Sequence, residues 1–267
     1  MHEKKLVYQK YPRKPVLAIY NLIDKIKFKL NIKPTGKLVI VSASDSTHFK
    51  SLIQFIKSVQ YYERGSQTVI YDLGMTKEET DIIRRDYPFV SLRVFDYTRY
   101  PWYFNVKIEA GRFAWKPVII LKVLSEFRLS TIWFDAGCKL TQPLYRIRDI
   151  INKEGFYSPI VLPGAIKDWV HPQFVEFLNA SNKIINNASF NGAMIAINYN
   201  HAKATKFVNK WTACALEEKC WVPSNSSKKN HRWQTITSAI KYIQCFLPYP
   251  PLAEVSRSDG GGQRVLM

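Results

Sequence analysis

One carboxylate, Asp135, follows an apolar run of the sequence, and two small residues, Ala136 and Gly137, come directly after it. The run at 130–134 predicts a buried strand. A carboxylate at a strand end can hold a divalent cation or a ribose hydroxyl, and glycine lets a backbone or a ligand approach closely. Asp135 can also simply cap the turn after the strand. We take the ligand-binding interpretation as the working hypothesis.

A metal ion at Asp135 would need further ligands, because one carboxylate does not hold a divalent cation alone. The phosphate oxygens of a substrate could supply them, and so could a histidine such as His171 or His231. His171 can equally be a structural histidine. If the protein uses a metal, we expect Mn²⁺ or Mg²⁺, with Asp135 and His171 as its protein ligands.

Basic residues supply a second kind of chemistry. Lys116 directly precedes Pro117 at the start of a predicted buried helix, where the free backbone N–H groups favour anions. A lysine at this place can bind a diphosphate, or it can lie in solvent. Much later, "NHRWQT" at 230–235 follows a basic loop, and its His231, Arg232 and Gln234 could reach phosphate or sugar oxygens. The alternative is an ordinary polar helix start.

Alternating strands and helices must position these residues. Continuously apolar strands are predicted within 37–45, 67–74, 91–97 and 130–134, and helices over 49–59, 76–87 and 114–127, with a capping box from Thr76 and Glu79. Such an alternation predicts an α/β fold with a parallel or mostly parallel sheet that is covered on both faces.

Ligands of such sheets bind outside the carboxyl ends of the strands. The sequence places polar residues at these ends, namely Ser42, Ser44, Asp45, Asp72, Asp96 and Asp135. We therefore expect them to share one edge of the sheet.

The rest of the chain is less regular. Helices are predicted at 143–153, 201–219 and 234–244, strands within 156–164 and 189–198, a loop at 222–230, and a flexible Gly-rich tail at the C-terminus. At the other end, 15–32 predicts a basic amphipathic helix, which either packs on the domain or lies on a membrane surface.

Charge and composition narrow the classes of function. The net charge is +18, and the first 50 residues hold 11 Lys or Arg against 3 Asp or Glu, which suggests anionic partners or a solvated basic surface. Nucleic acid is disfavoured as a partner, because no zinc-finger, RNP or KH signature occurs. The dinucleotide, P-loop and nucleophile-elbow fingerprints are missing too.

The compartment is open from the sequence. No apolar run reaches the roughly 18 residues of a membrane span, and the N-terminus does not read as a secretory signal. We expect a cytoplasmic, peripherally membrane-associated protein, or a protein of the Golgi or secretory lumen if an upstream anchor is missing. Cys214 and Cys220 are close enough in sequence to pair in an oxidising compartment, or they are two free thiols.

Four motifs in order, "VIYDLG", "AWKP", "WFDAG" and "CALEEKCWVP…KNHRWQ", resemble a little-characterised family of glycosyltransferase-like proteins in the nucleotide-diphospho-sugar transferase (GT-A) superfamily. The resemblance runs from about Lys37 to Ile243. It implies a GT-A three-layer sandwich over 37–250, with a nucleotide-sugar half at 37–140 and an acceptor half at 141–250. The basic extension 1–36 and the tail 251–267 lie outside it.

By position, Asp135 matches the acid of the superfamily's DxD element, Lys116 the lysine of the WKP motif, and His231 and Arg232 the late motif. The chain departs from the pattern at Gly137, where the second acid is usual, and it lacks the late Asp-Gln that the family tends to carry.

The resemblance implies a glycosyltransferase that moves a sugar from a nucleotide-diphosphate donor to a glycan, lipid-linked or protein acceptor. The candidate catalytic residues are Asp135, Asp168 and Arg232, with Glu176 as another available base. The candidate substrate-binding residues are Ser42, Ser44, Asp45, Asp72, Lys116, Gly137, Asn191, His231 and Gln234. A degenerate GT-A domain that binds nucleotide or glycan without turnover is the alternative. An RNA- or membrane-binding protein driven by its basic N-terminus is a third possibility.

Overall fold

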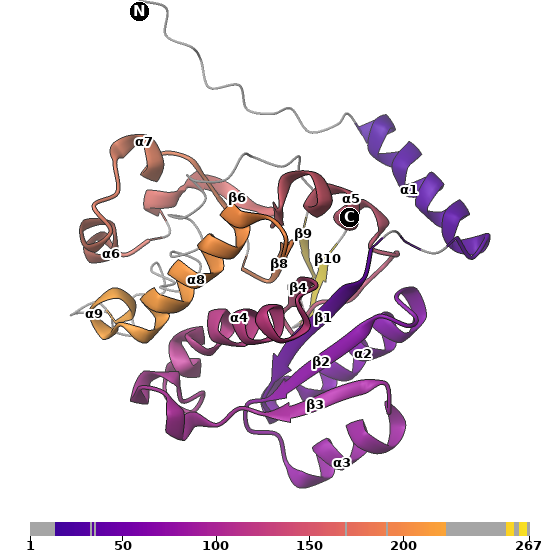
Figure 1. The fold of residues 1–267 in the computed structure, drawn as a ribbon, viewed down its shortest axis with the longest axis horizontal. Coiled ribbons are helices and arrows are strands. Elements are labelled where there is room, and N and C mark those ends of the chain that lie inside the picture. The colour runs from indigo at the N-terminus through magenta and orange to yellow at the C-terminus, as the bar shows by residue number, and fades with distance from the viewer. Residues whose placement is uncertain are drawn as a thin grey trace, which may run out of the picture.

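A six-stranded sheet forms the centre of the computed structural model, which describes residues 14–32, 34, 36–168, 170–190, 192–222, 255–258 and 262–265 (Figure 1). The strand order is β3-β2-β1-β4-β8-β5. Its strands are β1 (Leu38–Ser44), β2 (Gln67–Asp72), β3 (Val90–Val94), β4 (Ser130–Phe134), β5 (Phe156–Tyr157) and β8 (Met194–Ile197). The first four are mutually parallel, and β8 runs antiparallel to both β4 and β5. The predicted α/β class with a mostly parallel sheet is confirmed.

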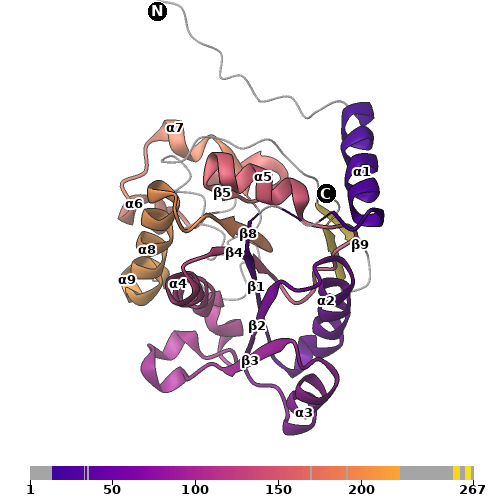
Figure 2. The ribbon, with the colours of Figure 1, turned by 45° about the vertical axis from the view of Figure 1, so that its right-hand side comes forward.

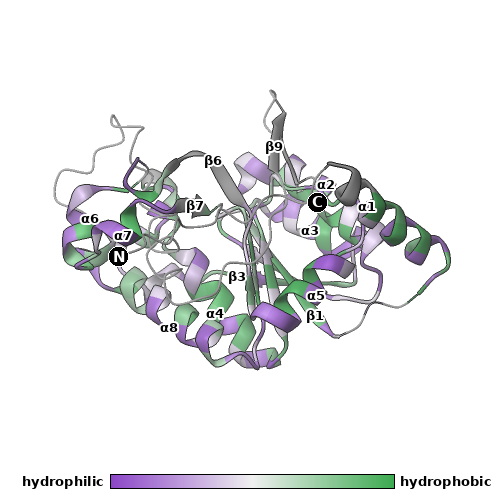
Figure 3. Cartoon of the chain, turned by 90° about the horizontal axis from the view of Figure 1, so that it is seen from above, coloured by the Kyte–Doolittle hydropathy of each residue, from purple (hydrophilic) through white to green (hydrophobic). Residues whose placement is uncertain are grey.

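Helices cover both faces of the sheet. The α-helices are α1 (Lys14–Lys29), α2 (Phe49–Tyr62), α3 (Lys77–Asp86), α4 (Trp115–Phe127), α5 (Tyr145–Glu154), α6 (Pro172–Phe177), α7 (Asn182–Ile185), α8 (Ala202–Leu216) and α9 (Glu218–Trp221). Helices α4 and α8 lie on one face, and α2 and α3 lie on the other, which makes three layers (Figure 2). Seen from above, apolar segments gather along the sheet and the inner helix faces (Figure 3).

Side chains of each central strand alternate between two separate apolar clusters, as the period of two requires. Val39, Val41 and Trp133 join the cluster under α4 and α8, whereas Ile40 and Ile132 join the one under α2. This double burial explains why the strands are apolar at nearly every position. The predicted capping box also forms: Thr76 and Glu79 close the start of α3 reciprocally.

Two segments differ from the sequence prediction. The single strand expected at 189–198 is two strands, because β7 (Ala188–Phe190) pairs with β6 (Ile160–Ala165) in a separate small sheet, and only β8 enters the central one. The pair Asn191-Gly192, whose residue types favour turns, separates them in sequence.

The tail expected to be flexible contains an antiparallel pair, β9 (Val255–Ser258) and β10 (Gly262–Val265). Three residues, Asp259-Gly260-Gly261, separate the two strands in sequence, whereas composition alone predicted a flexible tail.

The disulfide Cys214–Cys220 joins the end of α8 to α9, with the two Cα atoms 5.4 Å apart. Of the two alternatives left open by the sequence, a disulfide or two free thiols, the structure contains the disulfide. Cys138 is free and buried, and burial raises the pKa of its thiol. Among the described residues, no helix is both long and apolar enough to cross a bilayer. The predicted loop at 222–230, apart from Val222, and the predicted helix at 234–244 lie outside those residues.

Candidate active site

Asp135 lies directly after β4, which is flanked by β1 and β8. Its backbone N–H donates to the carbonyl of Ala193 (2.8 Å), and its own carbonyl accepts from the N–H of Cys138 (2.9 Å). The second bond closes a turn that contains Gly137. The main chain of Asp135 therefore shapes the turn, and its carboxylate is left for other contacts.

Lys116 holds that carboxylate. Lys116 stands in the first turn of α4, and its Nζ donates to Asp135 Oδ1 (2.7 Å) and to the carbonyl of Gly192 (3.0 Å). The ammonium also lies over the rings of Trp133 and Phe113, 5.4 and 5.6 Å from their centroids. The side chain of Lys116 is only 3% exposed, against 36% for Asp135. The lysine charge is thus compensated inside the protein, and the solvent-exposed alternative does not apply.

Trp133 fixes the same oxygen from a second direction. Its Nε1–H donates to Asp135 Oδ1 at 2.7 Å, so both bonds converge on Oδ1. Within the described part of the chain, Oδ2 of Asp135 receives no hydrogen bond. Asp135 is thus anchored through one oxygen and partly exposed. Its other oxygen is suited to accept a hydrogen bond from a hydroxyl group or to ligate a cation.

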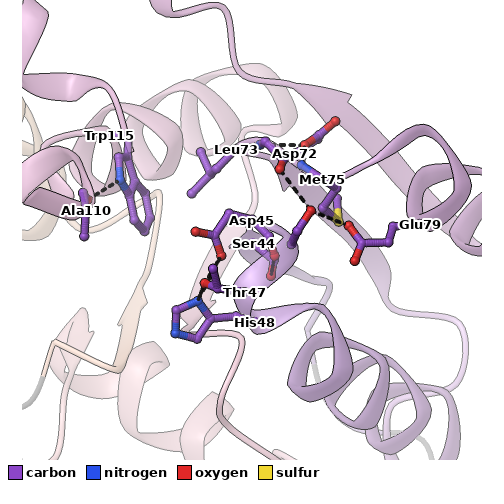
Figure 4. A network of polar contacts seen from close by, with 12 residues as sticks. Ser44, Asp45, Thr47, His48, Asp72, Leu73, Met75, Glu79, Ala110 and Trp115 are labelled. Atoms are coloured by element: carbon purple, nitrogen blue, oxygen red, sulfur yellow. Dashed lines mark hydrogen bonds and ion pairs between the residues drawn. The ribbon is translucent and has the colours of Figure 1, made fainter. Parts of the chain in front are cut away.

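The segment before α4 has unusual backbone geometry. Ala110, Arg112 and Phe113 have φ of 56°, 42° and 53°, the left-handed region that non-glycine residues seldom adopt. Indole N–H groups tie it down: Trp115 donates to the carbonyl of Ala110 (3.3 Å; Figure 4), and Trp221 to that of Arg112 (3.1 Å). Such strain persists only where its surroundings enforce it, and it concentrates at functional sites.

A second carboxylate, Asp45, follows the neighbouring strand β1. Thr47 Oγ1 donates to Asp45 Oδ1 (2.6 Å), and His48 Nδ1 lies 2.9 Å from the same oxygen (Figure 4). Burial works to raise the pKa of Asp45, but the bonds from Thr47 and His48 outweigh it and bring that pKa below its ordinary value. Asp45 is therefore ionised at neutral pH.

Asp72, at the end of β2, has a structural task. Its Oδ1 accepts from the N–H groups of Gly74 (2.8 Å) and Met75 (2.6 Å), which closes the loop into α3. Ser46 joins this loop to the end of β1, because its Oγ contacts the carbonyl of Gly74 (3.2 Å) and donates to Glu79 Oε2 (2.6 Å). The loops after β1 and β2 are thus bound to each other (Figure 4).

The other predicted residues of this edge are placed as follows. Ser42 has no exposed surface, and its Oγ finds no hydrogen-bond partner in the described structure. Ser44 is buried too and donates to the carbonyl of Asp45 (2.9 Å). Asp96 caps the short helix after β3 by accepting from the N–H of Thr98 (3.1 Å). Asp45, Asp72, Asp96 and Asp135 thus lie at the carboxyl ends of four adjacent parallel strands.

Two predicted residues have local structural contacts elsewhere. Asp168 is exposed after β6 and accepts from the N–H of Ala165 (2.6 Å). His171 caps α6 by accepting from the N–H of Gln173 (3.3 Å), and burial lowers its pKa. The described residues contain no group of three or more His, Cys, Asp or Glu side chains that could hold a metal ion. Asn191, His231, Arg232 and Gln234 lie outside the described residues.

Sequence reasoning missed the groups that orient Asp45 and Asp135, the two partly exposed acids. Trp133 stands two positions before Asp135, a spacing that puts two strand residues on one side of a sheet, so its role had a readable signal. Thr47 and His48 follow Asp45 closely, a common pattern in polar turns. The carbonyl of Gly192 has no sequence signal, because any residue has a carbonyl.

Comparison with known proteins finds one family model that matches part of the chain and several solved structures similar to it. A family described as "Protein of unknown function (DUF1647)" matches residues 16–121. No curated protein matches the chain. The solved structures similar to it include the bifunctional glycosyltransferase WbbM (13% identity, TM-score 0.45). The alignment covers 71% of this chain and 38% of WbbM.

Two further similar structures are glycosyltransferases. One is the galactosyltransferase LgtC with donor and acceptor sugar analogues (13% identity, TM-score 0.47, 76% of this chain and 70% of LgtC). The other is core-mannan synthase A of Aspergillus fumigatus in its Mn/GDP form (9% identity, TM-score 0.40, 69% of this chain and 66% of that one). At such low similarity, the roles of individual residues rest on the geometry of this chain.

The three-layer arrangement, with a mostly parallel central sheet and an acid directly after β4, is the fold class that the sequence resemblance implied.

Proposed function

We propose that the chain is a glycosyltransferase that moves a sugar from a nucleotide-diphosphate donor to an acceptor hydroxyl. One observation carries this proposal: Asp135 stands at the carboxyl edge of a parallel sheet, where ligands bind, with Oδ1 fixed by Lys116 and Trp133. Its carboxylate needs no reorganisation when a donor arrives. Electrostatic stabilisation by preorganised polar groups is usually the largest single contribution to the rate enhancement of an enzyme.

In this proposal Asp135 binds the donor's ribose or diphosphate through Oδ2. Lys116 is a positioning residue, because its buried ammonium acts through Asp135 and the carbonyl of Gly192. Asp45, which follows the adjacent strand β1, is ionised and held by Thr47 and His48. It accepts hydrogen bonds from hydroxyl groups of the nucleotide. Asp168 stays a candidate general base, and Arg232 stays the candidate that neutralises charge on the leaving group. The candidate substrate-binding residues from the late part of the chain stay Asn191, His231 and Gln234.

A divalent cation fits this site only in part. Asp135 offers one oxygen, and the described residues supply no further cluster of ligands, so the donor's diphosphate would have to complete the coordination. Bound there, Mn²⁺ or Mg²⁺ would supply charge stabilisation for the departing nucleotide. We therefore expect cation binding to require the nucleotide.

The second candidate is a domain that binds nucleotide or glycan without turnover. Gly137 at the place of a second acid favours it, since a metal then has one protein carboxylate fewer. The two candidates share the binding site and differ only in chemistry.

Thermal stabilisation by UDP, GDP, CMP and ADP, each with Mn²⁺, Mg²⁺ or EDTA, tests the shared site. A ligand that binds the native state raises the melting temperature. We expect one nucleotide to stabilise the wild type and to lose its effect in Asp135→Asn, which keeps an acceptor for Lys116. Asp86→Asn, at the far end of α3 with an exposed carboxylate, is the matched control and should respond as the wild type does. No stabilisation by any nucleotide would reject the donor site.

Turnover separates the two candidates. With the stabilising nucleotide's sugar conjugates, release of free nucleotide by the wild type and its loss in Asp135→Asn would support the transferase. Binding with no release across donors and acceptors would favour the non-catalytic domain.

A further inference from the structure

Helix α1 packs on the protein body with its polar and aromatic face. Asp24 is buried, and Asn21 Oδ1 accepts from Gln142 Nε2 (3.4 Å). The Phe28 ring lies 5.6 Å from those of Tyr61 and Tyr62 at the end of α2. Asn21, Asp24 and Phe28 recur at helical spacing, so they form one face of α1, and this face points inward.

The aliphatic side chains of α1 point the other way. Ile19, Leu22, Ile23 and Ile26 are 57%, 58%, 40% and 47% exposed, and Leu30, just after the helix, is 67% exposed. Their spacing of three and four residues makes one continuous stripe. At 3.6 residues per turn the stripe lies opposite the packed face. In Figure 3 α1 stands at the margin of the molecule with apolar colouring on its ribbon.

Lysines border this aliphatic stripe on both sides. By helical geometry, Lys25 and Lys29 lie along one border and Lys27 along the other. Lys25 and Lys29 are exposed, and Lys27 reaches over the ring of Tyr145, 5.6 Å from its centroid. The acid in the sequence of α1, Asp24, is buried on the opposite face. The outward surface of α1 therefore has an apolar centre, with exposed Lys25 and Lys29 along one border and Lys27, which lies over Tyr145, along the other.

We propose that the aliphatic stripe of α1 lies in the surface of an anionic lipid bilayer. Lysine stems can cover the apolar border while their ammonium groups reach lipid phosphates. A second copy of the chain fits the stripe less well, because pairing two identical stripes would bring their lysine borders together. With 16 residues, α1 is also shorter than a membrane-spanning helix.

The proposed lipid contact leaves the candidate active site accessible. Tyr61 and Tyr62 belong to the end of α2 that leads to the amino end of β2, whereas Asp135 lies at the carboxyl ends of the strands. A bilayer that covers α1 would thus lie toward the opposite edge of the sheet from Asp135.

Co-sedimentation of the full chain with vesicles tests the proposal. We expect the wild type to bind vesicles of phosphatidylcholine with about a third phosphatidylserine at least tenfold more tightly than pure phosphatidylcholine. Ile23→Glu/Ile26→Glu should lose that binding about tenfold or more. Leu216→Glu on α8 is the matched control, since Leu216 is 46% exposed against 47% for Ile26, and it should bind as the wild type does. Lys25→Glu/Lys29→Glu should lose mainly the preference for anionic vesicles.

A fluorophore on the introduced thiol of Ile26→Cys gives a second readout, because it does not disturb the charge of the stripe. Its emission should shift to the blue with anionic vesicles, whereas the same label on Asp86→Cys should not respond. Equal vesicle binding by the wild type and Ile23→Glu/Ile26→Glu would overturn the proposal. A second result would also overturn it: the wild type self-associates but does not bind vesicles, and the double variant no longer self-associates. That result would assign the stripe to a second copy of the chain.

Discussion

Replacing Asp135 by alanine should destabilise the protein as well as empty the site. Lys116 is 3% exposed, and the acceptors of its ammonium are Asp135 Oδ1 and the carbonyl of Gly192. Asp135→Ala leaves a buried positive charge with one neutral acceptor. The opposite change, Lys116→Met, leaves a partly exposed carboxylate that still accepts from Trp133. The two single variants therefore should not cost the same free energy.

The size of the effect follows from these contacts. Breaking a fully buried pair costs about 3–5 kcal/mol, and a hydrogen bond to a charged group contributes about 1.5–3 kcal/mol. Because the side chain of Asp135 is 36% exposed, water can replace part of its contact with Lys116. We expect Asp135→Ala to lower the free energy of unfolding by about 2–3 kcal/mol, which lowers the melting temperature by about 4–12 °C. Lys116→Met should cost about 1 kcal/mol or less, since methionine fills irregular apolar space.

A double-mutant cycle in urea, followed by circular dichroism without nucleotide, measures the coupling. Lys116→Met/Asp135→Ala should recover most of the loss of Asp135→Ala, because the stranded charge is then gone. That corresponds to a coupling of about 1.5–2.5 kcal/mol between residues in direct contact. Additive single effects, or an Asp135→Ala protein as stable as the wild type, would refute the argument that Lys116 depends on Asp135. Activity tests should accordingly use Asp135→Asn, which retains an acceptor.

Three further predictions concern other contacts. Asp45 has a lowered pKa, so it stabilises the folded state fully at pH values above the ordinary pKa of 3.8, and this stabilisation disappears as the pH falls through the folded-state pKa. Thr47→Val should raise the pKa of Asp45, which NMR titration measures, and should move the acid loss of stability to higher pH. Glu63→Gln should cost about 3–5 kcal/mol in urea unfolding, because Arg148, 4% exposed and 2.6 Å from Glu63 Oε2, would lose its buried partner; no loss would contradict the pairing. Gly155→Ala should cost at least about 2 kcal/mol, since Gly155 has φ +80° and the ring of His201 occupies the place of a Cβ; a stability equal to that of the wild type would contradict this packing.

The sequence by itself determined the four parallel strands of the sheet and the polar residues at their carboxyl ends. Continuous apolar runs and helical spacing are local properties, so the strands β1 to β4 and the helices α2, α3 and α4 could be predicted from them. Asp135 and Asp45 were found at strand ends for the same reason. The capping box of α3 was readable because its two partners are three residues apart.

Only the tertiary structure decided what these residues contact. Lys116 and Asp135 are 19 positions apart, and the carbonyl of Gly192 comes from the turn before β8, still later in the chain, so their meeting depends on how α4 and β8 pack beside β4. Packing also decided that Ser42 is enclosed and that Asp72 closes a loop. It decided, finally, which face of α1 turns outward, because a periodic pattern gives a helix two faces but does not say which one its neighbours cover.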